Sequence, residues 1–280
     1  MAVQIIVDSS ADIMPEIKER VKVVPAMVHF GDTEYMDGVT ITHKEFYEKL
    51  IESDVLPKTS QPNPAAFERV YKEVVEAGDT AVVLTIASNL SGTYQSAMIA
   101  AEDYEGKIYI VDTKTAAIGS GILTEFALEL VENGMDAKSV AMKLEEERDK
   151  VCVIAMVDTL EYLYKGGRLS KTSAVVGGLL SIKPVLTIRD GEIIVLGKAR
   201  GSKQGNNLLV TEIEKAGGVD FDKPLLLGYT GLTDVLLQKY IVDSERLWKG
   251  GAEELRYTPI GSAIGTHAGP GAVAVAFFKK

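Results

Sequence analysis

The first half of the chain alternates continuous apolar runs with segments whose apolar residues recur at helical spacing. The apolar runs, which predict buried strands, are Val3–Val7, Ala81–Ile86, Lys107–Val111 and Val151–Val157. The helical segments are Thr42–Ser53, Asn63–Gly78, a segment from about Ser91, Thr115–Asn133 and Ala137–Asp149. Strands that are apolar at every position are typical of sheets covered on both faces. The alternation therefore predicts an α/β fold with a mostly parallel sheet.

Two of these helices have clear start signals. Thr42 and Glu45 have the spacing of a capping box, in which each side chain binds a free backbone amide. Asn63 is a typical N-cap residue, and Pro64 follows it at the first helical position.

The run VKVVPAMVHF predicts one further strand, and Pro25 places that strand at an edge or a bulge.

The second half of the chain has a different order of elements. A short helix is broken by Gly166 and Gly167, and two strands flank Asp190-Gly191, a dipeptide typical of a type I′ hairpin. Further helices and strands are predicted at Lys203–Ala216, 225–229, Thr233–Leu247, 254–260 and 272–278. These elements predict a second α/β domain with a mixed sheet. We therefore expect an N-terminal domain at residues 1–157 and a C-terminal domain at residues 158–280.

Composition narrows the class of protein. The 280 residues are 46% hydrophobic and 25% charged, which is typical of globular chains. The net charge of −10 argues against a nucleic-acid or anionic-membrane surface, because both need basic residues. The single cysteine, Cys152, cannot form an internal disulfide, so nothing requires an oxidising compartment. With no signal-peptide pattern and no apolar run near ~18 residues, we expect a cytoplasmic protein without stable membrane insertion.

The sequence does not match the common motifs for binding nucleotides, dinucleotides or metals. The stretch KGGRLSKTS ends like a P-loop, but Lys165 and Ser170 occupy the positions of its two glycines. The stretch GSGILT lacks the third glycine of a dinucleotide fingerprint. His29, His43 and His267 are far apart in sequence, and the chain has no C-x-x-C pair. We therefore expect no cofactor and no bound metal.

Hydroxyl side chains gather where the strand Ala81–Ile86 leads into a helix. If Ser91 lies near the helix start, the amides of Gly92 and Thr93 are free to bind an anion, which the helix dipole also favours. Ser91 could instead be an ordinary N-cap. It could also be a nucleophile with His267 as its base, although the glycine that a nucleophile elbow has two residues before the serine is missing.

A second group of hydroxyls lies at Thr59 and Ser60. The strand-to-helix loops of a doubly wound sheet open at one edge, so the turns after Asp8 and Asp112 are expected beside the hydroxyls. Either aspartate would then be able to orient the base of a hydrolase. An edge with neutral donors and few basic residues suits one carboxylate better than a triphosphate. His267 is expected in a glycine-rich loop, GSAIGTHAGPGA, that approaches a ligand.

Five signatures occur in order along the chain: VDSSAD, KTSQP, LSGTYQSA, YLYKGGRLSK and HAGPGA. On these motifs the chain resembles the DegV family, the fatty-acid-binding subunits of bacterial fatty acid kinase, over essentially its whole length. The resemblance implies two α/β domains with a long-chain fatty acid buried between them. It also implies a set of residues around the carboxylate: Thr59, Ser91 and His267, with Ser60, Gly92 and Thr93 adjacent and Arg168 near the head group.

The resemblance implies delivery and not catalysis. The protein would shield the acyl chain and present its carboxylate to a separate ATP-dependent kinase subunit, which makes acyl-phosphate for phospholipid synthesis. We expect a monomer with no catalytic residues of its own. Arg200, with Lys198 and Lys203, forms the densest basic spot and is the expected contact with the kinase or the new phosphate. Ala274 stands where the family has a glycine, and its methyl is expected to narrow the pocket.

The tail of the fatty acid needs an apolar tunnel, and Ser173–Leu186 supplies the expected lining. Two other functions stay open from the sequence. One is a serine hydrolase that uses Ser91 and His267. The other is a binding protein for another small carboxylate, without a kinase partner.

Overall fold

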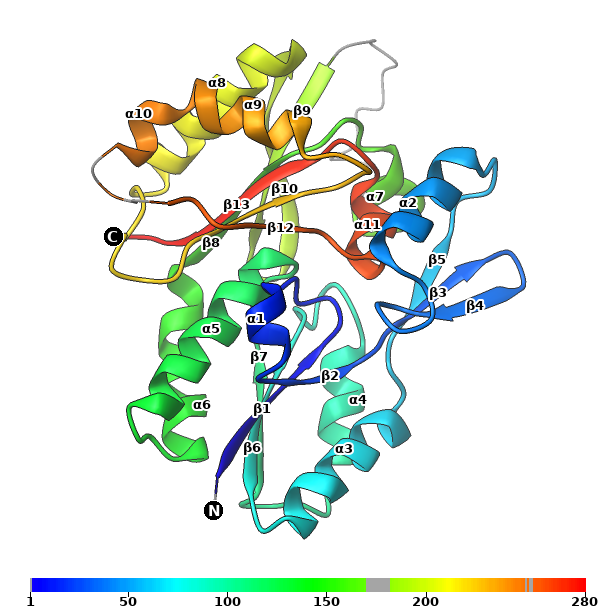
Figure 1. The fold of residues 1–280 in the computed structure, drawn as a ribbon, viewed down its shortest axis with the longest axis vertical. Coiled ribbons are helices and arrows are strands. Elements are labelled where there is room, and N and C mark those ends of the chain that lie inside the picture. The colour runs from blue at the N-terminus through cyan, green and yellow to red at the C-terminus, as the bar shows by residue number, and fades with distance from the viewer. Residues whose placement is uncertain (1, 170–181, 250, 252–253) are drawn as a thin grey trace.

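The computed structural model describes residues 2–169, 182–249, 251 and 254–280. Within these residues lie a four-stranded parallel sheet, a six-stranded mixed sheet and a three-stranded antiparallel sheet. Figure 1 shows the parallel sheet and its helices in the lower part, the six-stranded sheet above them, and the small sheet to one side. The predicted α/β fold, with a parallel sheet followed by a mixed sheet, is confirmed.

The four-stranded sheet has the order β2-β1-β6-β7, and all of its strand pairs are parallel. Its strands are β1 (Val3–Asp8), β2 (Lys22–Val24), β6 (Thr80–Thr85) and β7 (Ile108–Asp112). Helices cover both faces, which explains why these strands are apolar at nearly every position. One face carries α3 (Pro64–Glu76) and α4 (Thr93–Ala100), and the other carries α5 (Ile118–Glu132) and α6 (Ala137–Glu147).

The small sheet has the order β4-β3-β5 and lies beside α2. Its elements are β3 (Met27–Phe30), β4 (Thr33–Met36), β5 (Lys58–Ser60) and the helix α2 (His43–Glu52). The prediction of one strand around Pro25 was therefore wrong. Proline has no N–H to continue a ladder, and the chain passes there from β2 in the parallel sheet to β3 in the small sheet. The capping box of Thr42 and Glu45 is confirmed, as is the Asn63 cap of α3.

The six-stranded sheet has the order β10-β9-β8-β13-β11-β12. Its strands are β8 (Val151–Met156), β9 (Ile182–Arg189), β10 (Glu192–Arg200), β11 (Leu226–Tyr229), β12 (Tyr257–Pro259) and β13 (Val273–Phe278). Because β8 pairs with β9 and β13, strand pairing places it in this sheet, ahead of the predicted division between residues 157 and 158. That division into domains stays a prediction. The predicted hairpin joins β9 to β10, with the positive φ angles of a type I′ turn at Asp190 (50°) and Gly191 (75°).

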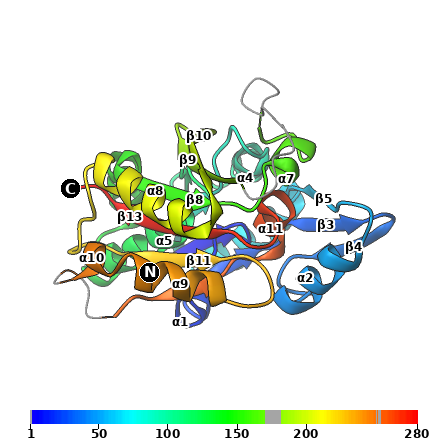
Figure 2. The same ribbon diagram turned by 90° about the horizontal axis from the view of Figure 1, so that it is seen from above.

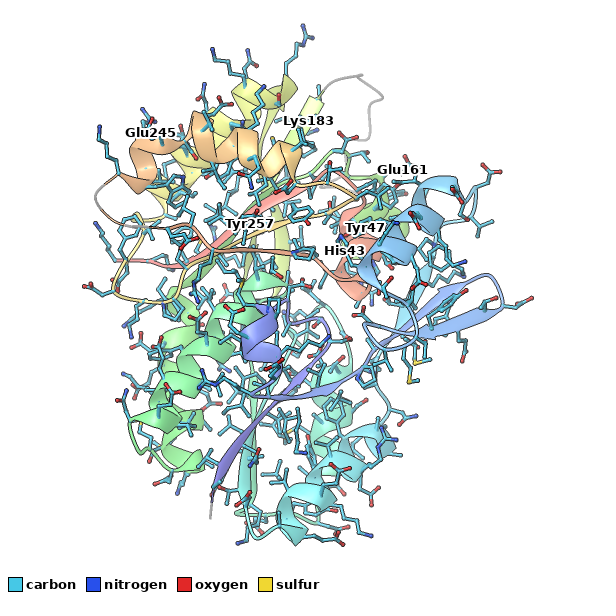
Figure 3. The ribbon with its side chains drawn as sticks, in the orientation of Figure 1. His43, Tyr47, Glu161, Lys183, Glu245 and Tyr257 are labelled. Carbon is cyan, nitrogen blue, oxygen red and sulfur yellow. The ribbon has the colours of Figure 1, made fainter. Side chains whose placement is uncertain are left out.

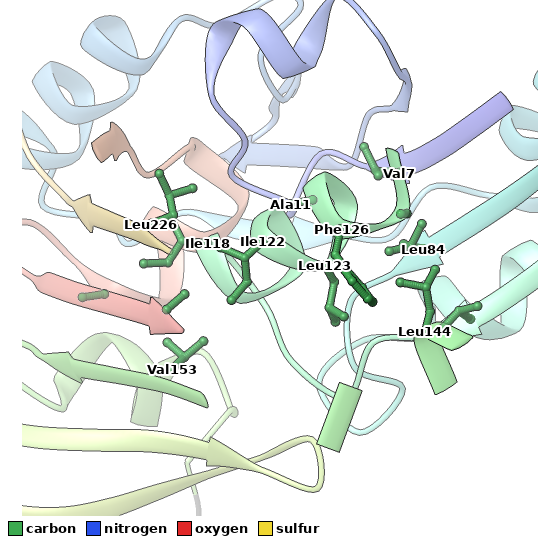
Figure 4. Close-up of a cluster of buried hydrophobic side chains, with 14 of the residues drawn as sticks. Val7, Ala11, Leu84, Ile118, Ile122, Leu123, Phe126, Leu144, Val153 and Leu226 are labelled. Atoms are coloured by element: carbon green, nitrogen blue, oxygen red, sulfur yellow. The ribbon is translucent and has the colours of Figure 1, made fainter. Parts of the chain in front are cut away.

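Helix α5 joins the two larger sheets. One face of the six-stranded sheet is covered by α8 (Gly201–Lys215), α9 (Val235–Asp243) and α10 (Glu245–Trp248). The opposite face packs against α5, which also packs on the parallel sheet. In Figure 4, Ile118 lies beside Leu226 of the mixed sheet, and Phe126 lies toward Leu84 of the parallel sheet. One continuous apolar core therefore links both sheets and fixes the loops between them.

Shorter helices include α1 (Pro15–Lys18), α7 (Glu161–Lys165), α11 (Ser262–Ala268) and a 3₁₀ turn at Arg148–Lys150. The prediction of a glycine-rich loop around His267 was wrong, because that stretch folds into α11. Gly265 allows this helix to approach α2 closely, since a Cβ atom there would lie 2.4 Å from the Tyr47 hydroxyl. Figure 2 shows α11 between α7 and the small sheet. No helix in the described part of the chain has the length and apolar character to cross a bilayer.

Candidate functional site

A cavity of about 440 Å³ lies between the six-stranded sheet and the loops after β1 and β6. Small-molecule sites typically measure ~300–1,000 Å³. The apolar part of its wall includes side chains from one face of the six-stranded sheet: Val153, Ala155, Leu186, Ile188 and Ala274. The polar part comes mostly from loops and helix ends: Asp8, Ser10, Thr59, Ser60, Gln61, Ser91, Thr93, Arg168 and His267. The cavity therefore brings together residues from every one of the three sheets and from α11.

His267 lies in the last turn of α11 and faces the small sheet. Its Nε2 atom is 2.8 Å from the Thr59 hydroxyl on β5. Its Nδ1 atom is buried against Gly166, where a Cβ atom would lie 2.2 Å from that nitrogen. Burial, together with the nearby charge of Arg168, lowers the pKa of His267 to about 4. The imidazole is therefore neutral at physiological pH.

The LSGT stretch forms a turn directly before α4. The hydroxyls of Ser91 and Thr93 are 2.8 Å apart, and the Thr93 N–H donates to Ser91 Oγ at 3.3 Å. The alternative that Ser91 is an ordinary N-cap does not hold, because the helix begins at Thr93 and Gly92 occupies the cap position. Ser91 lies directly before that cap, near the helix start. Ser91 and Thr93 both line the cavity, and Gly92 connects them without lining it.

Gln61 is a wall residue that lies in the KTSQP motif but not in the predicted site. Its Nε2 donates to the Gly92 carbonyl at 3.1 Å and to the Ser96 hydroxyl at 3.0 Å. A Cβ atom on Gly92 would lie 2.3 Å from Gln61 Oε1, so the glycine makes room for this amide. The side chain thereby holds the residues after β5 against the start of α4. The sequence signal that could have identified Gln61 as a site residue is its position in the same motif, two residues after Thr59.

Arg168 reaches the cavity from the end of α7. Its Nε donates to the Leu90 carbonyl at 3.1 Å, and its Nη1 donates to the Gly166 carbonyl at 2.8 Å. The backbone therefore holds the guanidinium beside the cavity, where it supplies a positive charge. Ser60 also lines the wall, and its hydroxyl is 2.9 Å from His29 Nε2.

Of the residues predicted for the kinase contact and the tail, some line the cavity and others do not. Arg200 directly precedes α8, is exposed and does not line the cavity. Ala274 lines the cavity beside Ala155, its cross-strand partner on β8. Of the predicted tail lining Ser173–Leu186, residues 173–181 lie outside the described residues, and Leu186 lines the cavity.

Asp8 and Asp112, the two aspartates considered as partners of a hydrolase base, do not hydrogen-bond to His267. Asp8 accepts from the Ile86 amide at 2.8 Å, and Asp112 accepts from the Ser88 hydroxyl at 2.6 Å. The imidazole of His267 pairs with a threonine hydroxyl, so these hydrogen bonds do not form a nucleophile–base–acid chain. Among the described residues, no group of three or more His, Cys, Asp or Glu side chains is arranged to hold a metal ion.

Comparison with known proteins places the chain in a family. The family model described as "Uncharacterised protein, DegV family" matches residues 2–280. The chain belongs to the DegV family. A DegV domain-containing protein of Caldanaerobacter subterraneus subsp. tengcongensis is 32% identical over 283 residues, which cover 99% of each chain. The family predicted from the five sequence signatures is therefore confirmed.

Solved DegV structures share the whole fold. A fatty-acid-binding DegV family protein from Thermus thermophilus is 33% identical, with a TM-score of 0.88 over 99% of this chain and 100% of that one. A fatty-acid-binding DegV family protein from Streptococcus agalactiae is 30% identical, with a TM-score of 0.86 over 100% and 99% of the two chains. Both structural neighbours bind fatty acids.

Proposed function

We propose that this DegV protein binds a long-chain fatty acid in the cavity, with the carboxylate at the polar part of the wall and the tail along the six-stranded sheet. The observation that carries the proposal is that one cavity has both an apolar wall from the six-stranded sheet and a polar wall of hydroxyls and Arg168. Thr59, Ser91 and Thr93 offer hydroxyl donors to a carboxylate, and Ser60 and Gly92 lie beside them. Fatty-acid binding by the two structural neighbours supports the same class of ligand.

The charges of the site suit a monoanion. A buried carboxylate needs a partner for its charge, and Arg168 supplies one beside the hydroxyls. His267 is neutral, so it takes part as a hydrogen-bonding group and adds no second positive charge. Asp8 also lines the cavity, and burial raises the pKa of its carboxyl, which reduces repulsion of the ligand.

The tail should dominate the affinity. Burial of ~15 methylenes at ~0.8 kcal/mol each gives ~12 kcal/mol before the costs of association and ordering are subtracted. A charge-assisted hydrogen bond contributes only ~1.5–3 kcal/mol. The hydroxyls and the guanidinium therefore set the orientation and the head-group class of the ligand more than its total binding free energy.

Calorimetric titration of delipidated protein with palmitate and with methyl palmitate tests the proposal. The two ligands share one tail, so the acid should bind more tightly if the polar wall holds a carboxylate. Thr59→Val removes a wall hydroxyl and should weaken binding of the acid more than binding of the ester. Thr211→Val, at a half-buried position of α8 outside the cavity wall, is the matched control. Failure of both ligands to bind, or equal affinity for them, would contradict the proposal.

The proposal extends to delivery of the bound acid to an ATP-dependent kinase subunit, by a cytoplasmic, monomeric carrier that has no catalytic residues of its own. Arg200 lies outside the cavity in an exposed basic segment, which suits contact with that subunit or with the new acyl-phosphate. Arg200→Ala should leave fatty-acid binding unchanged and lower the rate of phosphorylation in a coupled assay. Arg246→Ala, an exposed arginine on α10, is the control. An unchanged rate for Arg200→Ala would remove Arg200 from this role.

A further inference from the structure

Two buried aspartates bind the start of α11. Asp12 Oδ1 accepts from the Gly261 N–H at 2.7 Å. Asp37 Oδ1 accepts from the Ser262 N–H at 3.1 Å and also from the Ser262 hydroxyl. Only 7% of Asp12 and 5% of Asp37 is exposed. The second carboxyl oxygen of each has no hydrogen-bond partner in the described part of the chain. Both carboxyl groups are therefore committed to the start of this one helix. Burial, together with repulsion from Asp37 and Asp8, raises the pKa of the Asp12 carboxyl well above its ordinary value, so Asp12 acts as a hydrogen-bond acceptor and not as a fixed charge.

The two aspartates come from different parts of the fold. Asp12 lies in the loop after β1, and its own amide donates to the Ala117 carbonyl at 3.2 Å, which ties it to the start of α5. Asp37 directly follows β4 of the small sheet, and Thr59 lies on β5 of the same sheet. The small sheet therefore contacts α11 at both ends, through Asp37 at its first turn and through Thr59 at His267 in its last turn.

Helix α2 holds the residue that precedes this helix start. The Tyr47 hydroxyl donates to the Ile260 carbonyl at 3.1 Å. His43 lies 3.1 Å from the same carbonyl through Nδ1, and 2.9 Å from the Gly231 carbonyl through Nε2. Figure 3 shows His43 and Tyr47 on α2 where that helix faces α11. Polar contacts from distant segments thus fix the chain from Ile260 to Ser262.

We infer that Asp12 and Asp37 are positioning residues for the head-group site, because they fix the first turn of the short helix whose last turn carries His267. The inference rests on the proposed function. Helix α11 has seven residues and spans roughly 10 Å, so a displacement of its first turn also moves its last turn. Loss of the Asp12 carboxyl group leaves the half-buried Gly261 amide without this acceptor, and loss of the Asp37 carboxyl group does the same to the buried Ser262 amide. We expect Asp37→Ala to raise the Kd for palmitate roughly tenfold.

The direct test uses unliganded protein labelled with ¹⁵N-histidine. The chain has three histidines, so His29→Gln and His43→Gln assign the His267 resonances. In the wild type, His267 should titrate at a pKa of about 4. Asp12→Ala and Asp37→Ala should raise that pKa toward its ordinary value of 6.5, because a displaced helix exposes the imidazole. Asp37→Asn keeps an acceptor oxygen and should stay closer to the wild type.

Asp136→Ala is the matched control, because Asp136 caps α6 through the Ser139 amide at 2.9 Å, and α6 contributes no residue to the cavity wall. It should lower stability without moving the His267 pKa. If the alanine variants do not fold, Ser262→Ala removes one Asp37 contact and should raise the His267 pKa by a smaller amount. An unchanged His267 titration in the folded variants would overturn the inference. Because this titration needs no ligand, it separates failure of the inference from absence of fatty-acid binding by the wild type.

Discussion

Replacement of Ala274 by leucine should shorten the space for the acyl tail. Ala274 is 4% exposed on β13 and lines the cavity beside Ala155. Leucine adds about three carbon atoms at this point, which would displace about three methylenes of a tail that passes it. At ~0.8 kcal/mol for each methylene, the lost burial amounts to ~2.4 kcal/mol, or roughly a fiftyfold rise in Kd.

Calorimetric titration with saturated acids of decreasing length is the assay. The long acids should lose affinity by this factor in Ala274→Leu, whereas acids about three methylenes shorter should bind almost as they bind the wild type. Ala274→Gly is the opposite change and should favour longer acids, at a cost of roughly 0.5–1 kcal/mol in stability. Equal weakening at all lengths, or no change at any length, would refute the placement of the tail along β13.

The other predictions concern the surroundings of His267 and the backbone at the cavity. Gly166→Ala places a Cβ atom 2.2 Å from His267 Nδ1 and should weaken fatty-acid binding roughly tenfold in a titration. Gly167→Ala, at a φ of +74° with open space around it, should lower stability by about 1–2 kcal/mol and leave affinity unchanged. The wild type should lose stability as pH falls from about 6.5 to about 4, by at most on the order of 3 kcal/mol, because the folded pKa of His267 lies below its ordinary value. In His267→Gln, urea unfolding at pH 7 and pH 5 should lack this part of the pH dependence; an identical dependence would show that the imidazole is not buried. Ala117→Gly should raise the free energy of unfolding by about 1 kcal/mol, because Ala117 has a φ of 56° and a ψ of −134°; a lower unfolding midpoint would contradict this strain.

Elements with strong local signals could be predicted from the sequence. The Thr42 capping box and the Asp190-Gly191 turn depend on neighbouring residues, so their patterns carry the whole interaction. The hydroxyls of Thr59 and Ser91 were predicted to lie together, and both line one cavity. The shared edge of the parallel strands accounts for Ser91, which follows β6, but not for Thr59, which lies on β5 of the small antiparallel sheet.

Features that depend on distant contacts could not be predicted. Glycine has a low helix propensity, yet the stretch around His267 is helical because Gly265 permits contact with α2 and distant aspartates bind its first turn. The apolar pattern of β8 predicts a buried strand but does not indicate which of the two larger sheets the strand joins. Gln61 contacts the Gly92 carbonyl, 31 residues away, and no local pattern records that pairing.

The central claim is that the cavity of this DegV protein holds a long-chain fatty acid. Lipid extraction of freshly purified protein, followed by mass spectrometry, tests it most directly, because a tightly held acid should co-purify. We predict a near-stoichiometric long-chain acid in the extract, and its loss from a variant in which Thr59 and Ser91 are both replaced by bulky residues. An extract without fatty acid, together with no uptake of palmitate by the delipidated protein, would contradict the account.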